Sequence, residues 1–397
     1  MTRWITLLLA ATCAMAVATV YFAQPLLESI ATDLGIAQAR IGWVVGATQA
    51  GYALGLILIV PLGDLIDRKR LVLGQLLVAA LALVGVGFAQ AWAILLAALA
   101  VVGLMAVMVQ VMVAHAATLA TPARQGQAVG TVTSGVVLGI LLARLVSGAL
   151  ADLAGWRSVY FVAAGVLLLM ALVLCYSMPG GGRPAHRLGY LALIGSLFSL
   201  YRQDRLLRRH GLFALLIFAA FSVLWSSMVL PLGAAPLALS HTEIGLFGLA
   251  GIAGTLAASR AGRLADQGLG ERTLGMALAL LTLSWLPTAF VEQSLMAFTL
   301  GVLMLDFAVQ AVHVTNQSLL LAGRTGMASR LIGAYMCCYS IGSGLGAVLA
   351  SWVYAQWGWG AVCALGVAIS AAALGYWRLS RPERATEVAL PCSDQNL

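Results

Sequence analysis

The chain has 397 residues, of which 62% are hydrophobic and 9% are charged, and its formal net charge is +8. This composition excludes an ordinary soluble domain, in which about a quarter of the residues are charged. Apolar stretches long enough to cross a bilayer recur along the whole chain. They lie at about residues 4–27, 41–62, 71–89, 93–119, 127–150, 158–176, 212–233, 244–261, 273–291, 295–321, 331–354 and 359–377. The predicted fold class is therefore an all-α integral membrane protein with twelve transmembrane helices.

The distribution of Lys and Arg predicts the orientation. With both termini in the cytoplasm, nineteen of the twenty-two basic residues fall on the cytoplasmic side, in agreement with the positive-inside rule. Arg40 and Arg157 lie on the outer side, and Arg144 lies within a span. We predict a multi-pass protein of the cell inner (cytoplasmic) membrane with both termini cytoplasmic. This topology and anionic lipid head groups account for the net charge, so membrane lipids are expected partners and nucleic acid is not.

The first predicted span ends in polar residues that share one helix face, namely Tyr21, Gln24 and Glu28. Gln24 precedes Pro25, and Pro231 lies at the corresponding end of the seventh span. Proline at these positions predicts a bend in each helix, as a flexing gate would need. We expect Tyr21 and Trp225 of the seventh span to supply aromatic walls for a substrate; aromatic anchoring at the membrane interface is the alternative.

The loop after the second span reads PLGDLIDRKR, residues 61–70, with a glycine, an aspartate four residues on and then basic residues. It resembles the signature loop of the major facilitator superfamily, although Arg70 stands where that pattern has its second glycine. A degenerate copy, GRLADQGLGER, begins at Gly262. The resemblance implies the major facilitator fold, a transport function, and a cavity lined by helices one, four, seven and ten. It also implies gating by Asp67, with Gly63 and Arg68, and by Asp266 in the second copy.

Physically, such a gate places the Asp67 carboxylate against the N-terminus of the eleventh helix, where a negative charge is stabilised. This contact between the two halves would hold the cytoplasmic side shut. The basic residues of the loop also enforce the topology.

The fourth predicted span allows two interpretations. Met105, Met108, Met112 and His115 fall on one stripe, and thioether ligands suit Cu(I). However, Gln110 matches Gln310 at an offset of 200 residues, which turns Gln110 toward the cavity and the methionines away from it. We therefore interpret the methionine stripe as packing, and copper transport remains an alternative.

The fifth predicted span, with Gly130, Gly139 and Gly148, resembles the glycine-rich antiporter motif of the drug:proton branch found in bacterial efflux proteins. Ala143-Arg144 stands where that motif has Gly-Pro. Glycines at this spacing give a helix a low-relief face for close packing.

Internal repetition divides the chain into two halves. Gly130, Gly139 and the pair Gly155-Trp156 all recur 203 residues later, and the loop motif recurs at an offset of 199. We predict two pseudo-symmetric six-helix bundles, 1–176 and 211–378, of the kind found in transporters. They are joined by a cytoplasmic linker, 177–210, with an amphipathic helix on the membrane surface, and are followed by a cytoplasmic tail, 379–397.

The tenth predicted span carries the most unusual residues in the chain, namely Asp306, Gln310, His313 and Gln317. At about 100° per residue they fall within an arc of about 60° on one helix face. An ionised carboxylate at mid-membrane costs roughly 2.5–3.5 kcal/mol, so this stripe must face a polar cavity or a partner helix. We predict that Asp306 carries a proton; a stripe that only joins helices by hydrogen bonds is the alternative.

Arg144 and Asp306 are the only charges deep within the predicted spans. Arg144 could reach Asp306 directly or through water or substrate, or it could pair with Glu28 instead. Both burial and a nearby cation act on the charge state of a carboxyl, so a moving arginine could switch the protonation of Asp306. His313 either passes the proton toward the cytoplasm or hydrogen-bonds a neighbour.

The predicted function is secondary transport by a monomer that alternately opens a central cavity to either side. We predict proton-coupled efflux of a small neutral or weakly charged organic molecule, because the cavity carries so little charge. The proton-coupling residues would be Asp306, Arg144 and His313, and the substrate-binding residues Tyr21, Gln24, Gln110, Trp225, Gln310 and Gln317. No cofactor and no metal is expected.

Two alternative functions were considered. The first is proton-driven uptake of a nutrient such as a sugar or organic acid. The second is a membrane-embedded enzyme or a sensor. The sequence contains no nucleophile–base set, no large soluble segment, and no GxSxG, HExxH or P-loop pattern that would support it. The sequence therefore predicts a transporter, not an enzyme.

Overall fold

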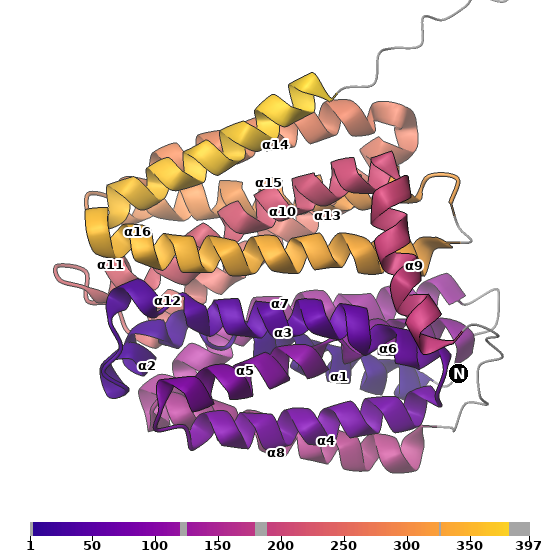
Figure 1. The fold of residues 1–397 in the computed structure, drawn as a ribbon. Helices are drawn as coiled ribbons and strands as arrows, with labels where there is room; N and C mark the ends of the chain where they lie inside the picture. Colours follow the sequence, from indigo (N-terminus) through magenta and orange to yellow (C-terminus); the bar gives the residue numbers. More distant parts are fainter. Residues whose placement is uncertain (1–2, 120–124, 179–188, 325–326, 381–397) are drawn as a thin grey trace, which may run out of the picture.

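A computed structural model describes residues 3–119, 125–178, 189–324 and 327–380, and these ranges contain helices and no strand (Figure 1). The chain's first half forms α1 (Arg3–Tyr21), η1 (Gln24–Leu26), α2 (Leu27–Asp33), η2 (Gln38–Arg40), α3 (Trp43–Leu58), η3 (Val60–Asp64), α4 (Arg68–Gly87), α5 (Trp92–Ala106), α6 (Met108–Leu119), α7 (Gln125–Ala154) and α8 (Trp156–Ser177). The predicted tail lies outside the described residues from residue 381 on.

The second half begins after α9 (Tyr190–Gln203), a helix that lies across the ends of the others in Figure 1. It forms α10 (Arg205–Ser227), α11 (Val229–Gly233), α12 (His241–Leu246), η5 (Phe247–Ala250), α13 (Gly251–Leu264), η6 (Ala265–Leu269), α14 (Gly270–Thr288), α15 (Leu295–Leu321) and α16 (Ala328–Leu379).

Ten helical segments in the described ranges are long and apolar enough to cross a membrane. Two of them, of 48 and 50 residues, contain a kink, because Gly268 and Gly358 adopt positive φ values of 77° and 73°. Glycine reaches this left-handed conformation without the steric cost of a side chain. With the two arms of each segment taken separately, the arrangement is consistent with the twelve predicted crossings. The predicted all-α membrane fold class is confirmed.

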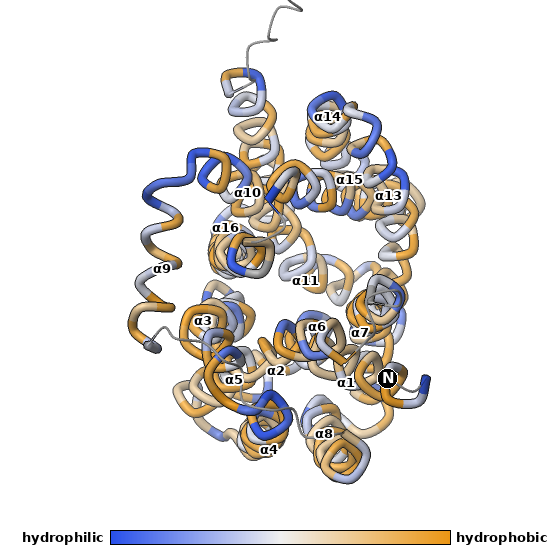
Figure 2. The backbone as a smooth tube through the Cα atoms, turned by 90° about the vertical axis from the view of Figure 1, so that its right-hand side faces the viewer, coloured by the Kyte–Doolittle hydropathy of each residue, from blue (hydrophilic) through white to orange (hydrophobic). Residues whose placement is uncertain are grey.

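The helices form two bundles. Figure 2 looks along them and shows α1–α8 gathered on one side and α10–α16 on the other, with α9 beside both. The repeated glycines occupy equivalent positions, since Gly139 of α7 lies against the backbone of Ala14 in α1 and Gly342 of α16 lies against that of Leu215 in α10. The internal repeat therefore corresponds to the same close helix crossing in each bundle.

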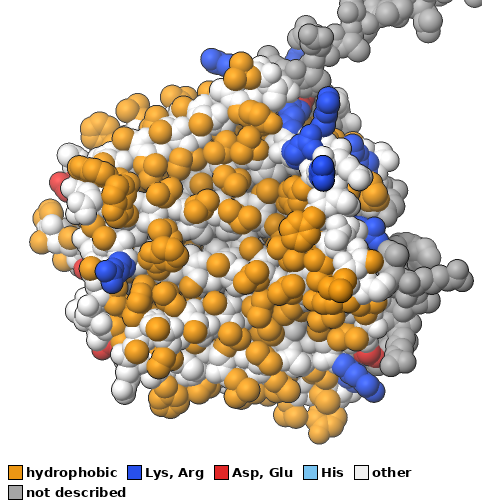
Figure 3. Space-filling view, viewed as in Figure 1, with side chains coloured by type: hydrophobic (Ala, Val, Ile, Leu, Met, Phe, Trp, Pro, Cys, Tyr) orange, Lys and Arg blue, Asp and Glu red, His pale blue; other side chains and the backbone are white. Residues whose placement is uncertain are grey.

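The surface matches a lipid environment. Figure 3 shows hydrophobic side chains over most of the visible face, and Lys and Arg gathered mainly at the end that carries α9. We call this end, with the starts of α1 and α4, the α9 end. The opposite end, with α2, α11 and α12, is the far end. A broad apolar surface bounded by charge is the arrangement expected of a membrane-spanning protein.

Two predicted spans contain an irregularity that the sequence did not predict. The fourth, 93–119, corresponds to one membrane-length segment, Trp92–Leu119, which breaks at Val107 between α5 and α6. The eighth, 244–261, changes to a 3-10 helix at η5 before continuing as α13. Neither break contains a proline, so the local sequence did not mark it. The prolines do coincide with breaks: η1 contains Pro25, and α10 ends at Ser227, shortly before Pro231 in α11.

Candidate functional site

Asp306 of α15 faces the protein interior and is only 4% exposed. The indole N–H of Trp225, on α10, donates a hydrogen bond to its Oδ1 at 3.0 Å. Both residues belong to the second bundle. The carboxyl group is therefore shielded from lipid. Among the described residues, its hydrogen-bond donor is the uncharged indole of Trp225.

Arg144 of α7 lies over the face of the same indole ring. Its guanidinium carbon is 3.5 Å from the centroid of the Trp225 ring. The rings of Tyr21 and Phe221 flank it at 5.2 and 5.6 Å. Its Nε donates to Oε1 of Gln24 at 2.7 Å, whereas its buried Nη2 has no hydrogen-bond partner among the described residues. We call Asp306, Trp225, Arg144, Gln24 and Tyr21 the central cluster.

The sequence left the partner of Arg144 open between Asp306 and Glu28, and among the described residues neither forms a close ion pair with it. The charges of Arg144 and Asp306 nevertheless act on each other within the cluster. The guanidinium stacks on the face of the Trp225 ring, and the N–H at the edge of the same ring binds Asp306. The carboxylate of Glu28 lies beside Gly233 of α11 instead.

A small pocket adjoins this cluster. It measures about 10 Å³, which is close to the minimum for one water molecule. Its lining comes from both bundles and consists of Gln24, Pro25, Arg144, Trp225, Met228, Val229 and Ile244. In this conformation a larger ligand has no room on that side of Arg144.

The rest of the polar stripe on α15 faces other helices of the second bundle. Nδ1 of His313 is 3.0 Å from the Tyr335 hydroxyl, and Nε2 is 3.3 Å from the side-chain nitrogen of Gln317. The ring of Phe218 stands edge-on to His313 at 5.1 Å. Gln310 packs beside Gly254 of α13. Of the four predicted residues, Asp306 is therefore the one that joins the central cluster.

A second group of aromatic residues closes the space between the bundles. The hydroxyls of Tyr21 and Tyr339 are 2.5 Å apart. Tyr52 of α3 stands edge-on to Tyr339, with the centroids 6.4 Å apart, and contacts Gln110. The sequence analysis did not predict Tyr52 as a site residue. Its hydroxyl group lies in an otherwise apolar span, and a polar group there could have marked it as a candidate.

Gln49 of α3 was missed for the same reason. Its backbone carbonyl and its Oε1 both accept from the Ser340 hydroxyl, at 2.6 and 2.9 Å, so it joins α3 to α16. By contrast, Met105, Met108, Met112 and His115 of the methionine stripe are all buried in the first bundle. This burial favours packing over metal binding.

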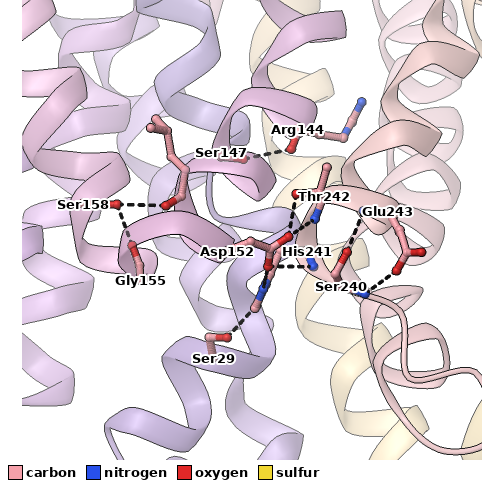
Figure 4. A network of polar contacts seen from close by, with 11 residues as sticks. Ser29, Arg144, Ser147, Asp152, Gly155, Ser158, Ser240, His241, Thr242 and Glu243 are labelled. Carbon is pink, nitrogen blue, oxygen red and sulfur yellow. Dashed lines mark hydrogen bonds and ion pairs between the residues drawn. The ribbon is translucent and has the colours of Figure 1, made fainter.

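The far end holds a polar network that joins the bundles (Figure 4). Asp152 of α7 accepts hydrogen bonds from the backbone N–H and the hydroxyl of Thr242, at 2.8 and 2.5 Å. It also accepts from the backbone N–H of His241, whose ring Nδ1 is 2.6 Å away. Nε2 of His241 lies 2.6 Å from the Ser29 hydroxyl of α2. We call Asp152, His241, Thr242 and Ser29 the far-end latch.

At the α9 end, the predicted gating residues bind within the first bundle. Asp67 is the N-cap of α4 and accepts from the backbone N–H groups of Lys69 and Arg70, at 2.8 and 3.2 Å. Arg68 donates to the carbonyl of Gly63 at 3.1 Å. Among the described residues Asp67 forms no hydrogen bond or ion pair with the eleventh predicted helix; its Oδ1 caps α4. Asp266 lies in η6, at the turn between α13 and α14.

Comparisons with known proteins agree with this architecture. The sequence model of the Major Facilitator Superfamily matches residues 7–337. The transporter YgaY of Escherichia coli O157:H7 is 42% identical over 363 residues, which cover 91% of this chain and 92% of YgaY. The multidrug resistance protein MdtG of Proteus mirabilis is 28% identical over 312 residues, which cover 76% of this chain and 75% of MdtG.

A solved structure extends the match to the fold. The bacterial homolog of the human lysosomal transporter Spinster, in its inward-facing and occupied conformation, superposes with a TM-score of 0.77. The superposition covers 95% of this chain and 96% of that one at 15% sequence identity, so it supports the fold alone. Together with the family match and the two helical bundles, it leads to one conclusion: the chain belongs to the major facilitator superfamily and is a membrane transporter, not an enzyme.

Proposed function

We propose that this protein is a proton-coupled exporter of small, neutral or weakly charged organic molecules. One observation carries the proposal: Asp306 is buried beside the interface between the bundles, and the indole that binds it also covers Arg144 of the other bundle. Asp306 is the proposed proton site. The multidrug resistance name of the relative MdtG favours export over uptake.

The coupling runs through Trp225. A hydrogen bond to a charged acceptor is stronger than one to a neutral acceptor, so protonation of Asp306 weakens its bond to the indole N–H. The indole also stacks on Arg144, which belongs to α7. A proton on α15 therefore changes how firmly the second bundle holds the first, which is what alternating access requires.

One proton supplies enough energy for this task. Moving one charge through 100 mV releases about 2.3 kcal/mol. A tenfold gradient of a neutral solute costs about 1.4 kcal/mol. A single carboxyl can thus drive export against more than a tenfold gradient. We place the α9 end in the cytoplasm of the cell inner membrane, because the basic residues gather there.

The experiment uses the full chain in liposomes that contain a pH-sensitive dye, with an imposed pH gradient and a panel of small organic compounds. We expect compound-dependent proton flux in the wild-type protein and a fall of at least about 100-fold in Asp306→Asn, which cannot bind and release a proton. Glu292→Gln, at an exposed carboxyl outside the cluster, should retain the wild-type flux.

Two outcomes would contradict the proposal. Proton coupling that persists in Asp306→Asn would remove the assigned proton site. Accumulation of the compound on the side that protons enter would show symport in place of the proposed antiport.

A further inference from the structure

The Arg144 side chain is held by surfaces from the opposite bundle. It extends from α7 of the first bundle, but the ring at 3.5 Å, Trp225, and the ring at 5.6 Å, Phe221, both belong to α10 of the second. From its own bundle it receives the ring of Tyr21 and one hydrogen bond with Gln24. Arg144 therefore crosses the interface between the bundles.

The bonding of this guanidinium is incomplete. The side chain is 2% exposed, and within the part of the chain that the structure describes its Nη2 has no hydrogen-bond partner. A buried arginine is normally paired with a carboxylate, because an unpaired buried charge is costly. Here three aromatic faces take that place, which is the arrangement by which proteins bind cationic ligands.

Two of these three aromatic faces belong to the second bundle and stay there without Arg144. Trp225, Phe221 and Asp306 all lie on the second bundle, and the Trp225 N–H already holds Asp306 beside the ring. Any motion that separates α7 from α10 withdraws the guanidinium and uncovers an aromatic face next to a carboxylate. These two features together select an organic cation.

We propose that Arg144 is a tethered occupant of a cation site on the second bundle, and that this site binds a planar, delocalised cation such as an aromatic amidinium when Arg144 withdraws. A flat cation fits because the guanidinium carbon lies only 3.5 Å from the ring centroid, a distance that requires face-to-face stacking. On its return Arg144 displaces the bound cation. The inference rests on the proposed function and its alternating motion, and it selects singly charged organic cations from the weakly charged part of the proposed substrate class.

The test measures binding of benzamidinium to the purified full chain by titration calorimetry, with neutral benzamide of the same shape as the reference ligand. We expect Arg144→Ala to bind benzamidinium at least about tenfold more tightly than the wild-type protein, since its competitor is gone. Benzamide affinity should not change. The double variant Arg144→Ala/Trp225→Leu should lose the gain, which separates stacking from the simple removal of a positive charge.

Arg157 supplies a matched control. Its guanidinium also stacks on a tryptophan, Trp156 at 4.4 Å, but at the far end and in a partly exposed position. Arg157→Ala should leave benzamidinium affinity unchanged. If Arg144→Ala fails to fold, Arg144→Gln, which keeps a polar side chain of similar reach, should show the same gain.

Three results would overturn the inference: no gain in the Arg144 variants, an equal gain for benzamide, or a gain that persists without Trp225. None of them bears on proton coupling, because the binding assay uses no pH gradient. If Asp306→Asn loses proton flux but the Arg144 variants bind benzamidinium no more tightly, the inference about Arg144 is rejected and the proton site stands. If the Arg144 variants bind benzamidinium more tightly but Asp306→Asn keeps proton coupling, the proton site is rejected and the inference about Arg144 stands.

Discussion

The two ends of the molecule differ in how the bundles meet. At the far end, the far-end latch joins α7 and α2 to α12, and the Ser351 hydroxyl of α16 accepts from the backbone N–H of Gly42 at 3.1 Å. Among the described residues, no direct hydrogen bond between the bundles lies at the α9 end. There, α9 contacts both bundles: the Tyr190 hydroxyl donates to the carbonyl of Leu58 at 2.7 Å, and that of Tyr201 to the carbonyl of Ala334.

Glycine positions show the same difference. Gly42 lies against the backbone of Ala347 across the interface, and Gly148 lies against that of His241. The repeat-related pair Gly130 and Gly333, near the α9 end, has no described neighbour within 4 Å of the place that a Cβ atom would occupy. Close packing and polar contacts therefore coincide at the far end. If the α9 end lies in the cytoplasm, as proposed above, the end that these contacts close is the outer one.

The largest effect on this asymmetry should come from Gly42→Leu. A side chain at this position has to displace the α16 backbone at Ala347 and the Ser351 hydroxyl. Overpacking of this kind costs about 1–3 kcal/mol or more, so the bundles should separate at the far end. Spin labels at Gln38 and Gln356, both exposed at that end, should report a longer distance.

Gly130→Leu is the matched control, since the same side chain near the α9 end meets no described neighbour. It should leave the distance between the labels unchanged. Equal widening in both variants would show that far-end closure does not depend on this close approach.

A smaller effect is expected from Asp152→Asn. The amide retains the shape of the carboxylate but removes the charge that accepts from His241 and Thr242. Hydrogen bonds to charged groups contribute about 1.5–3 kcal/mol, and partial exposure places this latch toward the lower value. The far-end distance distribution should gain a longer component.

Glu243→Gln tests whether the effect belongs to the latch. Glu243 forms a capping box with Ser240 within the second bundle and does not cross the interface. It should weaken the start of α12 without altering the far-end distance. A widening as large as that of Asp152→Asn would assign closure to the helix cap instead.

The smallest effect is expected from Tyr190→Phe at the α9 end. The substitution removes one hydrogen bond, to the carbonyl of Leu58, and so costs about 0.5–1.5 kcal/mol. Amide exchange should become faster across Tyr190–Gln203, while the far-end distance stays the same. Unchanged exchange would show that this bond does not hold α9 in place; Tyr176→Phe, at an exposed tyrosine, is the control.

The membrane-spanning fold and the position of the buried acid could be predicted from the amino-acid sequence. The tenth span, predicted at 295–321, is α15 with the same limits. Asp306 was expected to avoid lipid, and it is buried inside the protein. Hydrophobic length, helical periodicity and the cost of charge in lipid are local properties of a segment, so they can be read without knowing its neighbours.

Which side chains meet depends on the tertiary structure. Trp225 lies 81 residues after Arg144 and 81 residues before Asp306, and the pairings of Arg144 considered from the sequence did not include its stacking on Trp225. Likewise, Asp67 caps its own helix, and His313 meets Tyr335 of another helix. These contacts depend on how distant helices cross and on which end of the molecule is closed, and neither is a property of any single segment.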